Sequence, residues 1–235
     1  MPAQYGAHEV MEVHEVLSCE IDAINNFQLY RPHVKDQQLA HMLEHQLQFM
    51  MNGYQSFVQM LNGQGMAQAV PYRAPKNANP VYGLRQPGPV APNTSAEQID
   101  DRDIACGMLG AHKSAAAKKM MAALECADPQ IRGMVQQSAN NCAELAYETW
   151  QYMNQKGYYQ VPTMKEVTTQ TMLNAYAAPG MEAQAMPSMP MQQQQSGLAF
   201  SLQQQGTLAS PMPVAQTNMT LPTMAAPVHQ TGMPQ

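Results

Sequence analysis

Apolar residues recur at intervals of three and four positions in two separate parts of this 235-residue chain. This spacing places them on one face of an α-helix, which has about 3.6 residues per turn. The first part predicts helices over about 7–30 and 37–62. The second predicts helices over about 96–126 and 129–156, followed by a shorter one over 164–176. The chain is therefore expected to be all-α.

Residues with strong positional preferences mark the ends of these helices. Asp128 followed by Pro129 predicts a side-chain cap with proline at the first position of the fourth helix. Gly157 predicts its end, because glycine readily adopts the left-handed conformation found there. Thr94 and Ser95, each with an acidic or amide residue three positions later, predict the start of the third helix.

Two stretches of the chain lack any helical period. Residues 63–97 are rich in proline, which interrupts helices and favours extended backbone. Residues 178–235 combine Met, Gln and Pro, and Glu182 is their one charged residue. A segment so poor in large apolar residues cannot bury a core. We expect residues 63–97 to be an extended linker and residues 178–235 to be a disordered tail.

This order of segments predicts a particular architecture. Residues 7–62 form one helical hairpin, and residues 98–176 form a second hairpin with a short terminal helix. Two long hairpins bury their apolar faces most completely by packing against each other. The long proline-rich connection of residues 63–97 can serve as a crossover between them. The expected fold is a four-helix, ferritin-like bundle.

Composition argues against several classes of protein. The formal net charge is −5, which argues against nucleic acid as the main partner. No run of about 18 apolar residues occurs, so no membrane span is expected. The start, MPAQYGAHEVMEV, lacks the basic and then apolar pattern of a secretory signal. The four cysteines lack the Cys-x-x-Cys spacing of zinc sites and are too few for a dense disulfide framework.

Two stretches resemble proteins of the bacterial endospore coat. NNFQLYRPHVKDQQLAHMLEHQLQFMMNGYQSF, residues 25–57, resembles the N-terminal helix pair of clostridial-type spore coat proteins. Residues 101–159 resemble the coat protein F domain of endospore formers. The matching positions in that domain are Asp103, Lys113, the Glu125–Asp128-Pro129–Arg132 turn and WQYMNQKGYY at 150–159. The resemblance implies a ferritin-like bundle and a structural role in the spore coat.

The same resemblance sets the functional expectation. The protein would be a non-enzymatic coat component, made in the mother-cell cytoplasm and deposited on the spore. Its partners would be other spore coat proteins and further copies of itself. The alternative is a ferritin-like protein that binds metal or scavenges oxidants. A bundle that binds a small molecule is a third alternative, for which no motif is specific.

A metal centre is the main question that a ferritin-like bundle raises. A di-metal centre needs an inward Glu from each of two helices and a Glu-x-x-His pair from each of the others. No Glu-x-x-His occurs in the chain. The candidate ligands are Glu20, His41, Glu44, His45 and Glu148. His41 and His45 lie opposite the leucine stripe of their helix, as expected for a solvated polar face. We therefore expect no metal, no cofactor and no catalytic residue.

Lys113 is the candidate structural residue of the third helix. On a helical wheel it lies between Cys106 and Met120, on the side predicted to face the interior. A buried lysine must be paired or lose its proton. Lys113 is expected either to pair with Glu20 or Glu148, in the place a metal would occupy, or to extend its ammonium to solvent between small neighbours.

Overall fold

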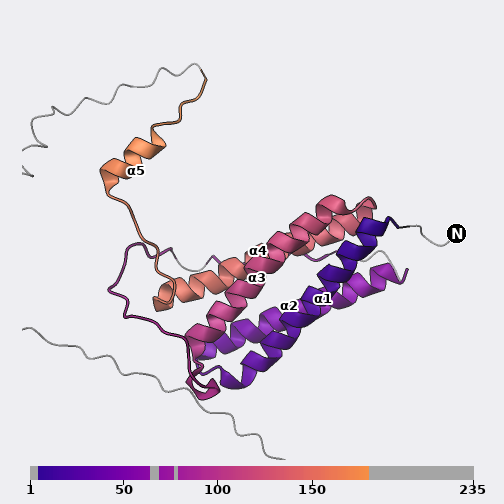
Figure 1. Ribbon diagram of the computed structural model, residues 1–235, viewed down its shortest axis with the longest axis horizontal. Coiled ribbons are helices and arrows are strands. Elements are labelled where there is room, and N and C mark those ends of the chain that lie inside the picture. The colour runs from indigo at the N-terminus through magenta and orange to yellow at the C-terminus, as the bar shows by residue number, and fades with distance from the viewer. Residues whose placement is uncertain (1–4, 64–68, 77–78, 180–235) are drawn as a thin grey trace, which may run out of the picture. The chain divides into compact units, whose positions relative to one another are not determined.

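The protein is all-helical over the residues that the computed structural model describes, which are 5–63, 69–76 and 79–179 (Figure 1). The prediction of an all-α chain is confirmed. Its helices are α1 (Ala7–Tyr30), α2 (Gln37–Leu61), α3 (Asp101–Glu125), α4 (Pro129–Lys156) and α5 (Glu166–Leu173), with the 3-10 turns η1 (Arg31–His33) and η2 (Ala96–Gln98).

Three further observations concern these described residues. They contain no β-strand, and Val161 makes only isolated bridges with Tyr82 and Gly83. Nor do they include a helix with the length and apolar character needed to cross a membrane. The predicted disordered tail, 178–235, lies outside the described residues apart from its first two positions.

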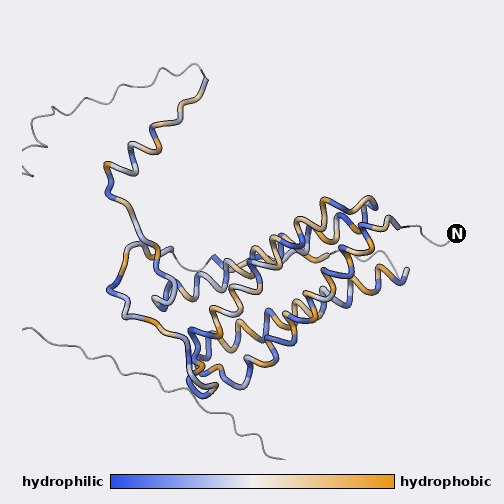
Figure 2. Tube along the Cα trace, viewed as in Figure 1, coloured by the Kyte–Doolittle hydropathy of each residue, from blue (hydrophilic) through white to orange (hydrophobic). Residues whose placement is uncertain are grey.

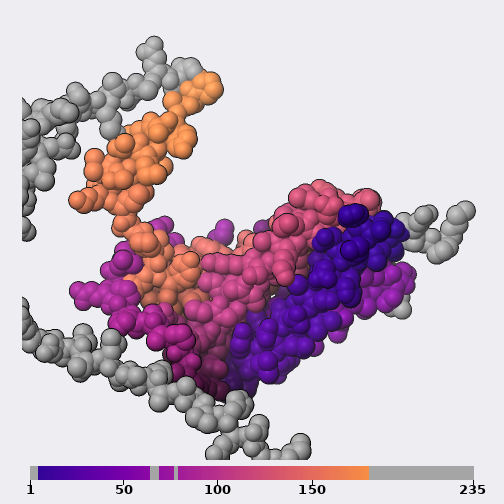
Figure 3. All heavy atoms as spheres, in the orientation of Figure 1, coloured from indigo at the N-terminus to yellow at the C-terminus, as the bar shows by residue number. Residues whose placement is uncertain are grey.

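The four long helices pack against one another in pairs. α3 packs most extensively against α4, α1 packs against both α2 and α3, and α2 packs against α4. Figure 3 shows α1, in indigo, lying alongside α3, in pink. Figure 2 shows that hydrophobic positions recur along each of the four. Each helix therefore has two neighbours against which to bury its apolar side.

Hydrogen bonds between helix ends define the direction of each helix. The Asp101 carboxylate at the start of α3 accepts from the backbone N–H groups of Lys35 (2.8 Å) and Asp36 (3.1 Å), which precede α2. α2 and α3 thus begin at the same end. Glu9 near the start of α1 accepts from the backbone N–H of Asp128 (2.8 Å), which precedes α4. α1 and α4 therefore run parallel to each other and opposite to α2 and α3.

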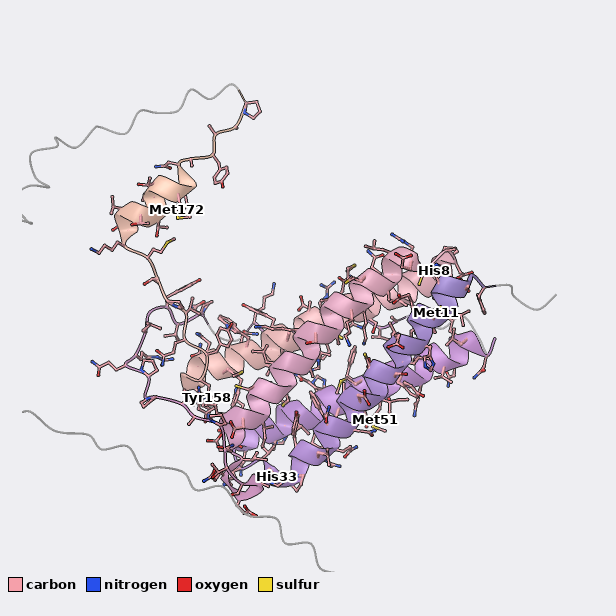
Figure 4. All side chains as sticks on the ribbon, in the orientation of Figure 1. His8, Met11, His33, Met51, Tyr158 and Met172 are labelled. Carbon is pink, nitrogen blue, oxygen red and sulfur yellow. The ribbon has the colours of Figure 1, made fainter. Side chains whose placement is uncertain are left out.

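Because α2 and α3 begin at the same end, the connection between them must run the length of both helices. Figure 4 marks one end by His8 and the other by His33 and Tyr158. The described residues 69–76 and 79–85 of this connection, which we call the strap, lie along α4. Tyr72 and Ala74 of the strap are buried.

Side chains of α4 hold the strap through its backbone. Asn141 accepts from the N–H of Tyr72 (2.8 Å) and donates to the carbonyl of Val70 (2.9 Å). One turn later Glu144 accepts from Ala74 (3.0 Å). Gln151 donates to Pro75 (2.8 Å), and Asn154 exchanges two hydrogen bonds with Val81 (2.7 and 3.0 Å). The extended backbone of the strap forms no internal hydrogen bonds of the helical kind. Side chains of α4 therefore supply hydrogen-bond partners for its N–H and C=O groups.

The ends of α4 use the residues that the sequence marks. The Asp128 carboxylate accepts from the N–H groups of Gln130 (2.8 Å) and Ile131 (3.0 Å), and Pro129 is the first helical residue. Gly157 follows the last turn with φ of +78°, in the left-handed region. The two hydrogen bonds to Asp128 satisfy N–H groups that the first turn of a helix leaves unpaired.

The predicted start of α3 is wrong by several residues. Ser95 precedes only the short turn η2, in which the side chain of Gln98 accepts from the N–H and hydroxyl of Thr94. The helix itself begins after Asp100, whose carboxylate caps it while Asp103 reaches back to the Asp100 N–H. Two capping-box patterns lie close together in the sequence, but only the one at Asp100 forms, and it starts the helix.

The predicted inward face of α3 is also wrong. Cys106, Lys113 and Met120 are exposed. The buried residues of α3 are Ile104, Ala105, Met108, Leu109, His112, Lys119, Ala122 and Ala123. Alanines occur on several sides of this helix, so the apolar period did not distinguish one face. The polar His112 and Lys119 mark the true interior, because tertiary partners satisfy them.

Candidate functional site

A buried ion pair lies between α1, α3 and α4. The Lys119 ammonium of α3 donates to the Glu20 carboxylate of α1, and their side chains are 2% and 11% exposed. Lys119 also donates to the Ser138 hydroxyl (3.0 Å) and the Cys142 sulfur (3.4 Å), both on α4. All three protons of the ammonium therefore have acceptors, as a buried lysine requires.

The charges of this cluster follow from burial and proximity. Burial by itself lowers the pKa of Lys119, but the charge of Glu20 and the hydrogen bonds to Glu20 and Cys142 outweigh burial and raise that pKa above the ordinary value. Burial raises the pKa of the Cys142 thiol, so the sulfur is protonated at neutral pH. The Glu20 carboxylate is therefore the counter-ion of Lys119, and the pair is neutral overall.

A second polar network lies further along α3 and α4 and includes α2. The Gln46 side chain of α2 is fully buried, and its amide nitrogen donates to the Glu148 carboxylate (2.7 Å). Its amide oxygen therefore faces His112, whose Nε2 lies 2.9 Å away and carries the proton. Burial, aided by the nearby Lys119 charge, lowers the pKa of His112 to about 3, so the ring is neutral at pH 7.

The strap closes this second network from the α4 side. The Tyr72 hydroxyl donates to the same Glu148 oxygen that Gln46 contacts, and His45 Nδ1 lies 3.3 Å from that hydroxyl. Burial raises the pKa of Tyr72, and the neighbouring Glu148 carboxylate adds to the effect. The linker thus completes a hydrogen-bonded network in addition to connecting two helices.

The structure separates the candidate metal ligands. Glu20 pairs with Lys119, while Glu44 is exposed and pairs with Arg31. His41 and His45 are exposed on α2, where they line a groove that Glu148 also borders. Over the described ranges, no three His, Cys, Asp or Glu side chains come close enough together to hold a metal ion.

The residues of the interior do not fit a di-metal centre. Such a centre needs several inward carboxylates together with two histidines. The inward polar positions of the four helices include Glu20, Gln46, His112, Lys119 and Cys142. Glu20 is already paired with an ammonium group, and Glu9, the other buried carboxylate of the described residues, accepts from the backbone N–H of Asp128 near the start of α4.

The sequence left two arrangements open for Lys113, an ion pair or extension to solvent, and the buried ion pair forms at Lys119 instead. Lys113 is exposed, and its ammonium lies 5.0 Å from the ring centroid of Tyr159. Sequence reasoning missed Lys119, His112 and Gln46. A signal was present in α3, because Lys119 follows His112 by two helical turns and therefore shares its face.

Comparison with known proteins defines the class to which these helices belong. Residues 100–162, which contain α3 and α4, match the Coat F domain family. Over 174 residues the chain is 31% identical to the Spore coat protein F-like protein YhcQ of Bacillus subtilis (strain 168), covering 73% of this chain and 80% of that relative. The chain therefore belongs to the coat protein F family. No solved structure matches it.

The matched domain is incomplete as a polar site. It contains His112, Lys119 and Cys142, but neither the Glu20 nor the Gln46 partner. Those partners come from α1 and α2, outside residues 100–162. The preceding helices α1 and α2 therefore supply partners for the buried polar groups of the family domain.

Proposed function

We propose that this protein is a structural, non-enzymatic component of the bacterial endospore coat. The observation that carries the proposal is the 31% identity to a spore coat protein F-like protein over 73% of this chain and 80% of the relative. The Coat F match over residues 100–162 supports the same assignment.

The proposed architecture for this role is a ferritin-like four-helix bundle. The pairing of α1 with α2 and of α3 with α4 supports two helical hairpins. The shared starting end of α2 and α3, with the strap between them, supports a crossover connection as in ferritin-like bundles. In this proposal the ion pair of Lys119 and Glu20 replaces a metal centre at the interior of the bundle.

We further propose that residues 178–235 act in assembly. This segment has a single charged residue, so little electrostatic repulsion opposes its association with other chains. Its many methionines provide flexible apolar contacts. The partners would be other spore coat proteins and further copies of this chain, after synthesis in the mother-cell cytoplasm.

Imaging in a sporulating bacterium tests the proposal directly. A fluorescent fusion of the whole chain is expected to collect around the developing spore, starting from the mother cell. A second fusion lacking residues 178–235 is expected to remain diffuse or to label the spore weakly. A whole-chain fusion that stays diffuse through sporulation would contradict the coat assignment. Equal spore labelling by both fusions would contradict the proposed role of the tail alone.

Metal analysis of the purified protein tests the non-enzymatic part of the proposal. Iron and manganese are expected at well below one ion per chain. Stoichiometric metal that is lost in Glu20→Ala, but retained in the exposed control Glu15→Ala, would overturn the proposed structural role. It would favour a metal-binding, ferritin-like protein instead.

A further inference from the structure

A cavity of about 170 Å³ lies beside the buried ion pair, bounded by described residues of all four long helices and of the strap. Its polar end holds Glu20, Lys119, Ser138 and Cys142. Its walls are mostly apolar. They include Phe49, Met50, Phe57, Val70, Met134 and Leu145.

The size of this cavity exceeds ordinary packing defects. Protein interiors are close-packed and contain few voids larger than a water molecule. An apolar cavity of about 150 Å³ is large enough to bind benzene. The space beside Lys119 is therefore large enough for a six-membered ring with one substituent.

Gly53 contributes to this open space. It lies within α2, where glycine is a poor helix former, and it borders both the main cavity and a smaller one of about 20 Å³. A Cβ at this position would meet nothing within 4 Å. Close packing therefore does not require glycine here, and the missing side chain enlarges the cavity.

The polar end of the cavity disfavours charged ligands. Lys119 and Glu20 neutralise each other, so an anionic ligand would be repelled by Glu20 and a cationic one by Lys119. Lys119 already directs its three protons to Glu20, Ser138 and Cys142. The ligand should therefore be neutral and should not need the ammonium.

Two hydrogen-bonding groups remain for a ligand at this end. The Ser138 hydroxyl accepts from Lys119, which leaves its own proton free to donate. Glu20 Oε1 accepts no hydrogen bond from any described residue, because Lys119 contacts Oε2. One donor beside one acceptor matches a hydroxyl group, which both accepts and donates.

We propose that this cavity binds a small neutral amphipathic molecule, with a hydroxyl group between Glu20 and Ser138. The apolar body, a single ring or a short alkyl chain, packs among Phe49, Phe57 and Leu145. This inference is independent of the role in the spore coat, because it rests on the cavity alone.

Titration of the full-length protein with phenol, followed by calorimetry, tests the proposal. Phenol is expected to bind at one site per chain, and toluene, which lacks the hydroxyl, is expected to bind at least tenfold more weakly. Gly53 is an exposed residue that lines the cavity, so the added ring of Gly53→Phe should obstruct it and abolish phenol binding. Gly53→Ala, which adds only a methyl group in open space, should retain it.

Methyl NMR of the methionines locates the ligand. Met50 and Met134 line the cavity, so their resonances should shift on addition of phenol. Met11, which is 66% exposed, should not shift. Ser138→Ala should reduce phenol affinity by about tenfold and leave toluene affinity unchanged. The proposal is overturned if wild-type protein does not bind phenol, if Gly53→Phe binds it normally, or if the shifts spread evenly over the methionines.

Discussion

The ammonium of Lys119 and the carboxylate of Glu20, two residues 99 positions apart in the chain, form a salt bridge between α3 and α1. Both side chains are almost fully withdrawn from water. Breaking such a pair leaves one uncompensated buried charge, whereas replacing both partners with apolar groups removes the problem. This asymmetry makes the pair testable.

Removing one partner of the salt bridge should be strongly destabilising. We expect Lys119→Met to lower the free energy of unfolding by about 3 kcal/mol, because Glu20 is left buried and unpaired. The double variant Glu20→Leu/Lys119→Leu should recover most of this loss. Urea denaturation at pH 7 measures both.

Lys113→Met is the matched control, and it should change stability by less than about 0.5 kcal/mol because Lys113 is exposed. A loss for Lys113→Met as large as that for Lys119→Met would contradict the assignment.

The neutral, buried His112 should make the fold sensitive to acid. Its pKa is lowered from 6.5 to about 3 in the folded protein, so the unfolded chain binds more protons between these values. The contribution of His112 to the free energy of unfolding is fully present above pH 6.5 and is lost as the pH falls toward 3. Between pH 7 and pH 5 we expect a loss of about 2 kcal/mol, measured by urea denaturation.

The variant His112→Gln checks the origin of this acid sensitivity. It should be less stable than the wild type at pH 7, because the hydrogen bond to Gln46 and the edge contact with Phe27 are altered. Its stability should nevertheless change less between pH 7 and pH 5. An unchanged pH dependence in His112→Gln would mean that another group titrates.

The strap should detach locally when its main anchor on α4 is removed. Asn141→Leu deletes the hydrogen bonds to the backbone of Tyr72 and Val70, which we expect to cost about 2 kcal/mol. Hydrogen exchange followed by mass spectrometry should then show faster exchange in residues 69–76. Asn140→Leu changes the exposed neighbouring position and should leave that exchange unaltered. Equal protection in both variants would show that Asn141 does not anchor the strap.

Replacing Gly133, within α4, and Gly157, at its C-terminal end, with alanine should change stability in opposite directions. Gly157 has φ of +78°, and a Cβ there would lie 3.3 Å from the Arg85 guanidinium, so Gly157→Ala should destabilise by about 1–2 kcal/mol. Gly133 lies within α4 with open space around it, so Gly133→Ala should stabilise by up to about 1 kcal/mol. Thermal melting of both variants gives the comparison. Shifts of the same sign would contradict this reading of the two positions.

Local signals predicted much of the helical structure. Asp128, Pro129 and Gly157 occupy the ends of α4 because capping depends only on backbone groups within a few residues. The start of α3 was wrong because Ser95 and Asp100 both offer a capping pattern, and sequence spacing does not rank them. The strap was expected to be extended, but its docking on Asn141 and Asn154 had no local signature.

The contacts buried between the long helices required the tertiary structure. Whether a lysine can be buried depends on a carboxylate that the fold brings near, and Glu20 is far from Lys119 in sequence. The same holds for the contact of Gln46 with His112. The sequence by itself determined the helices, the ends of α4 and the family, since these depend on periodicity, caps and residue identity. Only the tertiary structure decided which face of the alanine-rich α3 is buried, because that face is selected by partners on other helices and not by its own apolar pattern.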